Sequence, residues 1–153
     1  MRFAVLFVLL SAAGMTQEPA KPADTDKAAL VGEWVASRVE ALQEEMKDSR
    51  KVRITVEGDK LVMSGVEMEK ESYTFRLNSS KNPKVIDLYQ GDKLMSRTIY
   101  ALEKEELRLC VGLQHWRVGL TSKEREFVKA GDRPTEFDSR QGILFVLQRG
   151  KGK

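Results

Sequence analysis

The sequence predicts an all-β domain, built as an eight-stranded antiparallel up-and-down barrel with one or two short helices. Apolar and polar residues alternate along short stretches such as Val52–Glu57 and Tyr73–Leu77, which is typical of a sheet buried on one side. Turn signals separate these stretches. Many short strands joined by hairpins favour a sheet that closes on itself, because closure removes exposed edges. The predicted strands cover residues 33–40, 52–57, 60–66, 73–77, 84–90, 96–103, 106–111 and 143–149.

Two of the predicted hairpin turns carry glycine at their first central position, Gly58 and Gly91. Glycine suits this position of a type II′ turn, whose twist matches that of the flanking strands. The repeated tetrapeptide GDKL at 58–61 and 91–94 is therefore interpreted as recurring turn chemistry, not as a duplicated site. A third hairpin turn is predicted at 103–106.

Two other segments have helical character. Residues 40–49 have high helix propensity and are predicted to form a short helical connector after the first strand. Thr121 and Glu124 have the spacing of a capping box, so one or two helical turns are predicted over residues 122–129.

The first 14 residues are predicted to be a secretory signal peptide. Arg2 precedes the apolar run Phe3–Leu10, and small residues follow at Ser11–Gly14, which are the three parts of such a signal. The run is shorter than the roughly 20 residues that a membrane-spanning helix needs. Because no cysteine follows the small residues, a lipid anchor is not expected. We expect cleavage near Gly14 to Gln17 and a soluble, extracytoplasmic protein, either periplasmic or secreted.

A flexible tether is predicted over residues 15–28, followed by one domain over residues 29–150. Thr16–Lys27 has no large apolar side chain and contains two of the four prolines. Such a segment buries too little surface to offset the entropy lost on ordering. The remaining residues suffice for one ordinary domain with its own core.

The two ends of the predicted sheet carry residues that are expected to meet. Gly32-Glu33-Trp34 begins the first strand, and Arg149 ends the last strand on the face of its apolar residues. In a closed barrel these strands are neighbours, so the guanidinium can stack on the indole and gain roughly 0.5–2 kcal/mol. Gly32, Trp34 and Arg149 are therefore predicted to close the barrel structurally, with no chemical role.

These residues also support a resemblance to a known family. Further blocks occur in order along the whole domain: LVGEW (30–34), VEGDKL (56–61), NPKVIDL (82–88), IYALEKEELRLC (99–110), RPTEF (133–137) and LFVLQR (144–149). Together they resemble a family of lipocalin-like exported domains abundant in planctomycete bacteria. The chain departs from the family's pattern at 103–106, which lacks the usual glycine, and at 112–132, which is longer than the usual link. The resemblance implies a lipocalin-like barrel and an extracytoplasmic location, but no established activity.

Composition argues against several classes of function. The 26 basic and 23 acidic residues give a net charge of only +3 and are interleaved, so no nucleic-acid partner is expected. Cys110 and His115 are the only cysteine and histidine, too few for a zinc site, and a Cys110–His115 pair lacks an evident orienting acid. The glycines lie at turns and form no phosphate-binding loop, so no cofactor is expected. We therefore expect a protein without catalytic activity, and a hydrolase is the least favoured alternative.

The favoured function is binding of a small or peptide-like ligand, because an eight-stranded barrel is wide enough for one small ligand or for a side-chain core. Counting in twos from Trp34 places Ala36 and Arg38 inside the barrel. The same count, guided by Leu102, places Tyr100 inside. An inward arginine requires a counter-charge, so Arg38 and Tyr100 are the candidate contacts for an anionic group of the ligand. A bulge in the first strand would instead turn Arg38 toward water.

The alternative function is that of a cell-surface protein-interaction domain. The long segment 112–132 carries Trp116 and Phe127 among mixed charges, a composition that suits the centre of an interface. The size of the interior separates the two alternatives. A roomy interior favours a ligand carrier, and a filled interior favours a partner bound outside.

Overall fold

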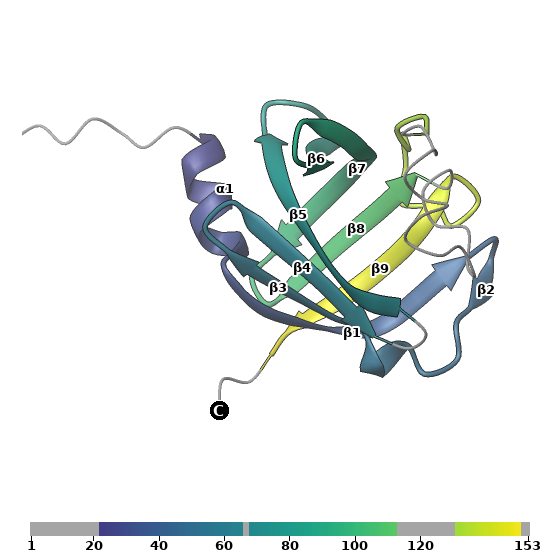
Figure 1. Cartoon of the computed structure of the whole chain (residues 1–153). Helices are drawn as coiled ribbons and strands as arrows, with labels where there is room; N and C mark the ends of the chain where they lie inside the picture. The colour runs from purple at the N-terminus through teal and green to yellow at the C-terminus, as the bar shows by residue number, and fades with distance from the viewer. Residues whose placement is uncertain (1–21, 66–67, 113–130, 151–153) are drawn as a thin grey trace, which may run out of the picture.

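A computed structural model describes residues 22–65, 68–112 and 131–150 of this chain. These residues form a closed antiparallel barrel of eight strands with one additional short strand, which confirms the predicted fold class (Figure 1). The elements are α1 (Pro22–Leu30), β1 (Gly32–Ala41), β2 (Glu44–Glu45), the 3-10 turn η1 (Ser49–Lys51), β3 (Arg53–Glu57), β4 (Lys60–Gly65), β5 (Met68–Asn78), β6 (Lys84–Gln90), β7 (Lys93–Glu103), β8 (Glu106–Gly112) and β9 (Gly142–Arg149).

The barrel strands pair in chain order, β1-β3-β4-β5-β6-β7-β8-β9, and pairing of β9 with β1 closes the sheet. The short strand β2 pairs only with the last residues of β1. Neighbouring strands run in opposite directions between the two ends of the barrel. We call the end where β1 begins and α1 packs the helix end, and the end where β1 turns into β2 the hairpin end. Figure 1 shows α1 at the helix end of the barrel, where it contacts β5.

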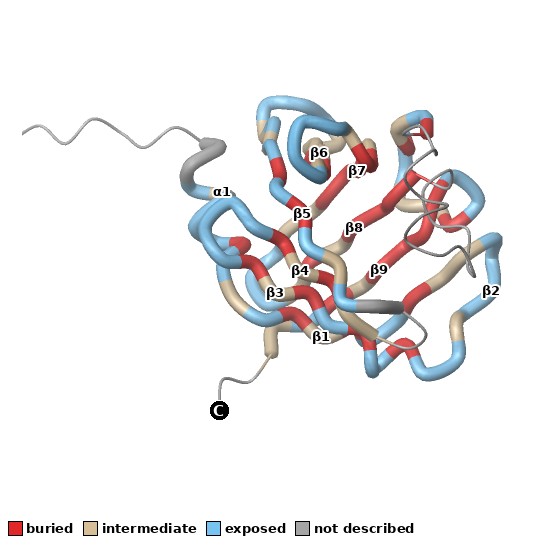
Figure 2. The backbone as a smooth tube through the Cα atoms, viewed as in Figure 1, coloured by how far each residue is buried: buried red, intermediate tan, exposed pale blue. Residues whose placement is uncertain are grey.

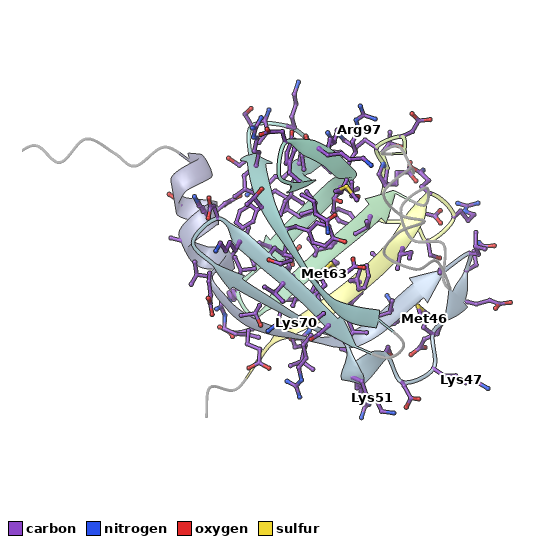
Figure 3. The ribbon with its side chains drawn as sticks, in the orientation of Figure 1. Met46, Lys47, Lys51, Met63, Lys70 and Arg97 are labelled. Atoms are coloured by element: carbon purple, nitrogen blue, oxygen red, sulfur yellow. The ribbon has the colours of Figure 1, made fainter. Side chains whose placement is uncertain are left out.

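Side chains fill the barrel interior at the helix end and along its middle. Trp34, Ile54, Met63 and Leu147 are 0% exposed, so no space large enough for a water molecule adjoins them. Buried positions recur along the barrel strands in Figure 2, and Figure 3 shows Met63 inside the barrel. The interior is therefore packed as a core in this part of the barrel, with the density expected of protein interiors.

A second, smaller apolar cluster lies on the outer face of the barrel. Residues 131–141 cross this face before β9 begins, and Phe137 packs there against Ile99, Cys110 and Leu144. The Arg108 guanidinium lies 5.3 Å from the centre of the Phe137 ring. This cover explains why outward-facing apolar residues on β7, β8 and β9 are buried.

The prediction of a flexible tether over residues 15–28 is wrong for its second part. Residues from Pro22 onward form α1, and Pro22 occupies the first helical position, where its missing N–H costs nothing. The carboxylate of Asp26 accepts hydrogen bonds from Tyr100 and Lys84 on the barrel. These tertiary contacts stabilise a helix that the composition alone does not favour. Residues 15–21 and the predicted signal peptide lie outside the described residues.

The predicted helix over residues 40–49 is also wrong. The chain continues β1 to Ala41, turns through Leu42 and Gln43, and forms β2. The backbone N–H groups of Leu42 and Gln43 donate to Ser139, which holds the turn in place. Pairing across the hairpin therefore outweighs the helix propensity of this segment. The predicted helical turns over residues 122–129 lie outside the described residues.

The predicted glycine turns have the expected backbone geometry. Gly58 and Gly91 have φ of +60° and +58°, and the aspartate after each glycine does not have positive φ, as in a type II′ turn. Lys104 takes the corresponding place in the β7–β8 turn with φ of +46°. A left-handed conformation at a residue with a Cβ atom is strained. The β7–β8 turn is therefore a weak point that glycine would relieve.

Replacing Lys104 with glycine should raise the free energy of unfolding by about 0.5–1 kcal/mol. Relief of the left-handed strain gains about 1–2 kcal/mol, and the greater freedom of glycine in the unfolded chain returns about 0.5–1 kcal/mol. Urea denaturation measures the difference. Gly58→Lys is the matched control and should cost a similar amount, because a Cβ atom there meets nothing within 4 Å. Unchanged stability of Lys104→Gly would contradict the strain.

Candidate functional site

The structure brings the predicted closure residues together at the helix end. Trp34 and Arg149 are direct partners in the β1–β9 pairing, and the Arg149 guanidinium lies 4.4 Å from the centre of the indole ring. Trp34 is fully buried, and its Nε1–H donates to the carbonyl oxygen of Leu30 at 2.8 Å. The tryptophan therefore joins the barrel core to the last residue of α1.

Arg149 also holds the end of α1. Its Nη2 and Nη1 donate to the carbonyl oxygens of Ala29 at 2.7 Å and Val31 at 3.0 Å. Carbonyl groups at a helix C-terminus have no partner within the helix, so this arginine supplies one. Gly32 has φ of +130°, and a Cβ atom there would lie 3.0 Å from Arg149 Nη1. Glycine at this position therefore serves both the backbone conformation and the approach of the guanidinium.

Tyr100 is inside the barrel, as its position in the strand predicts, but it contacts α1. Its hydroxyl donates to Asp26 Oδ2 at 2.7 Å, and Lys84 Nζ donates to the same oxygen at 2.7 Å. Burial raises the pKa of the Tyr100 phenol far above its usual value, and the hydrogen bond to Asp26 and the charge of Asp26 raise it further. Tyr100 is thus a neutral donor that anchors the helix. The sequence did not predict this contact because Asp26 lies in the segment interpreted as a tether.

The prediction that Arg38 faces the barrel interior is wrong. Ala36 pairs with Leu147 and Arg38 with Val146, so β1 has one extra residue, Ser37, opposite β9. This bulge reverses the side-chain alternation, as bulges do. Arg38 is exposed and forms an ion pair with Glu40 at 3.2 Å on the outer face. Arg38 and Tyr100 therefore form no shared interior site.

The proposed interaction loop is not described. Trp116, Phe127 and His115 all lie within residues 113–130, which are outside the described part of the chain. Their proposed roles stay predictions.

Cys110 is buried on the outer face beneath residues 131–141. Its Sγ lies 3.7 Å from the carbonyl oxygen of Asp138, and Leu144 and Ile99 pack beside it. Burial is the largest cause that raises the pKa of the thiol, to about 11. At neutral pH the group is a protonated thiol, and this form is a poor nucleophile.

A surface groove lies on the outer face at the helix end of β6 and is the candidate binding site. Its volume is about 500 Å³, within the range of about 300–1,000 Å³ that is usual for ligand sites. We call it the outer groove. It combines the end of β5, the β5–β6 connection, β6, β7 and residues 133–135. Its lining residues are Asn78, Lys81, Asn82, Pro83, Val85, Asp87, Ile99, Arg133, Pro134 and Thr135.

An arginine fixes one wall of the outer groove. Arg133 Nη1 donates to the carbonyl oxygen of Thr98 at 3.0 Å. Its Nη2 lies 2.7 Å from a buried oxygen of Asp87, an ion pair that is not aligned as a hydrogen bond. Arg97 Nη1 donates to the carbonyl oxygen of Gly131 at 3.2 Å, which adds a second attachment of the returning segment to β7. Arg133 therefore positions Pro134 and Thr135 beside β6.

Two other grooves are less suited to hold an organic ligand. One is formed by a single connection, residues 45–51. The other, lined by Glu40, Gln43 and residues 136–139, is mostly polar and carries three carboxylates. In the described ranges no group of three or more His, Cys, Asp or Glu side chains is placed to hold a metal ion. The outer groove remains the best candidate because it combines an apolar floor with charged and amide side chains.

The sequence did not predict the outer groove, although two of its walls lie in blocks that support the family resemblance. Residues 82–88 and 133–137 are separate blocks in the sequence, and only the folded chain places them side by side. The pairs Asn82-Pro83 and Arg133-Pro134 each combine a polar residue with proline, which is typical of surface segments. This pattern does not indicate that the two segments lie side by side in the fold.

Comparison of the chain with protein-family models, with curated proteins and with solved structures finds no significant match. Among the helices of the described residues, none has the length and apolar character needed to cross a bilayer.

Replacing Trp34 with alanine should lower the free energy of unfolding by about 3–5 kcal/mol, the usual cost of deleting a buried aromatic side chain. Because domains of this kind have only about 5–15 kcal/mol in total, the variant could unfold. Trp34→Phe keeps most of the apolar volume and loses the hydrogen bond to Leu30, so a smaller loss is expected. Thermal melts of the two variants give the order. A Trp34→Ala melt equal to that of the parent would exclude the closure role.

The Cys110 thiol should react very slowly with a disulfide reagent in the folded protein. A thiol with a pKa of about 11 is almost wholly protonated at pH 8, and residues 137–139 cover the sulfur. Reaction in denaturant, where the pKa returns to about 8.5, is the control. Equal rates in the two conditions would show that the thiol is accessible.

Proposed function

We propose that this protein is a non-catalytic binding module that takes a peptide-like ligand in the outer groove. The observation that carries the proposal is the convergence of three distant chain segments on one concave surface with an apolar floor, whose partly exposed side chains are Pro83 and Val85. Binding sites typically combine such a floor with a few polar groups. Here the polar groups are the amides of Asn78 and Asn82 and the charges of Lys81, Asp87 and Arg133.

The filled interior favours an outer site over a site inside the barrel. Side chains such as Trp34, Ile54 and Leu147 have no exposure, so a ligand at the helix end would have to displace core residues. Displacing a packed core side chain costs several kcal/mol. A small ligand enclosed in this part of the barrel therefore has less support than a ligand on its outer surface.

Catalysis has less support than binding. Cys110, the strongest nucleophile in the described residues, is a buried thiol with a raised pKa. The phenol of Tyr73 is also buried, which raises its pKa to about 12. Neither group is poised for acid–base or nucleophilic work near neutral pH, where catalytic pKa values are usually tuned.

We further propose that the protein acts outside the cytoplasm, as the basic, apolar and small-residue pattern of residues 1–14 indicates. In such a compartment the ligand would come from extracytoplasmic peptides or from exposed segments of other proteins.

A second candidate is a protein-interaction surface at the hairpin end. Leu42 is 68% exposed and has φ of +51°, and the next residue, Gln43, has φ of +67°. Consecutive left-handed residues with side chains cost of order 1–3 kcal/mol each, and such strain concentrates at functional sites. An exposed leucine held in this conformation is suited to insert into an apolar pocket of a partner.

Titration of the isotope-labelled protein with a neutral peptide, two leucines flanking a serine and blocked at both ends, tests the main proposal by NMR. We expect the largest shift changes at the amides of Val85, Ile99 and Thr135. Val85→Gln places a polar amide on the groove floor and should weaken binding at least several-fold. Val62→Gln is the matched control, because Val62 is also a half-buried valine, on β4, but is not part of the groove. Shift changes that avoid the groove, or equal effects of both variants, would exclude the proposed site.

A further inference from the structure

The outer groove carries an excess of positive charge. Its lining includes two cations, Lys81 and Arg133, and one carboxylate, Asp87, which gives a net charge of +1. Arg133 forms an ion pair with Asp87, and Arg97 is the register partner of Asp87 in the β6–β7 pairing. The charge of Asp87 is therefore balanced by an arginine of the protein, and the net positive charge of the groove comes from its second cation.

Lys81 supplies that remaining charge. It is exposed in the β5–β6 connection, and the structure gives it no ion-pair partner among the described residues. Arg133 is committed to the carbonyl oxygen of Thr98 and to Asp87. The Lys81 ammonium is therefore the charged group at the groove rim that is available to a ligand. The apolar floor of the groove lies beside it.

We propose that the outer groove selects acidic peptides, with an apolar side chain on the floor formed by Pro83 and Val85 and a neighbouring carboxylate at Lys81. This inference rests on the proposed function, because it names the chemistry of the ligand that the groove takes. Charge complementarity at the rim of an interface discriminates between partners more than it adds affinity. The apolar contact supplies most of the binding, and Lys81 determines which peptides are accepted.

The location of Lys81 makes this selection separable from folding. The side chain is in an exposed connection and supports no internal contact, so a substitution there leaves the barrel core unchanged. Lys47 is a matched control, because it is exposed in another connection, and Figure 3 shows it extending away from the barrel at the hairpin end. Lys81→Glu and Lys47→Glu change the net charge of the whole protein equally.

Two five-residue peptides, blocked at both ends and identical except for a central glutamate or lysine between leucines, serve as probes. Their dissociation constants are measured by NMR titration at low ionic strength with the folded, full-length domain. We expect the glutamate peptide to bind about fivefold more tightly, which corresponds to the worth of an exposed ion pair. Lys81→Glu should abolish or reverse this preference, whereas Lys47→Glu should preserve it.

The outcomes separate the inference from the function beneath it. If both peptides bind in the groove with equal affinity, or if Lys81→Glu leaves the preference unchanged, the acidic selection is wrong and the binding function stands. If neither these peptides nor the neutral peptide shifts the groove amides, the binding function itself is wrong. Screening offers a further check, since added salt should reduce the preference for glutamate without removing the binding.

Discussion

The pairing of β1 with β9 is the constraint on which the rest of the structure depends. It closes the barrel and places Arg149 against Trp34, although the two residues come from opposite ends of the domain. Arg149 then reaches two carbonyl oxygens at the end of α1, and Trp34 reaches a third. The same set of contacts therefore closes the barrel and attaches α1 to it. Loss of the indole would remove a large core side chain, the cation–π contact and one of the hydrogen bonds that hold α1.

The same contacts determine where a ligand can bind. α1, Trp34 and Tyr100 seal the helix end, and the adjoining interior has no water-sized space. The outer groove, in contrast, is a concave surface on the outside of the barrel. The outer face becomes structured where residues 131–141 return across it. Arg133 and Phe137 attach this segment to β6, β7 and β8, and the attachment creates both the cover over Cys110 and one wall of the outer groove.

Charge on the outer face follows from this arrangement. The arginines that attach the returning segment are neutralised by Asp87 or engaged by carbonyl oxygens, so they act as structural groups. Lys81 is exposed in the β5–β6 connection and lines the outer groove, and it has no ion-pair partner among the described residues. The groove therefore contains one cation that attaches the returning segment, Arg133, and one cation that we propose contacts a ligand, Lys81.

Sequence alone determined the barrel, its eight strands and the contact between Trp34 and Arg149. Alternation of side chains and glycine in tight turns act through local backbone preferences, so contiguous residues reveal the strands and turns. Closure of the barrel then makes the first and last strands neighbours, which brings Trp34 and Arg149 together. The tertiary structure decided the orientation of Arg38, the folding of α1 and the outer groove. The Ser37 bulge depends on the register with β9, α1 depends on donors from β6 and β7, and the groove depends on residues 82–88 meeting 133–135. Each of these features is stabilised by residues far apart in the chain, and a pattern within one segment carries no information about such partners.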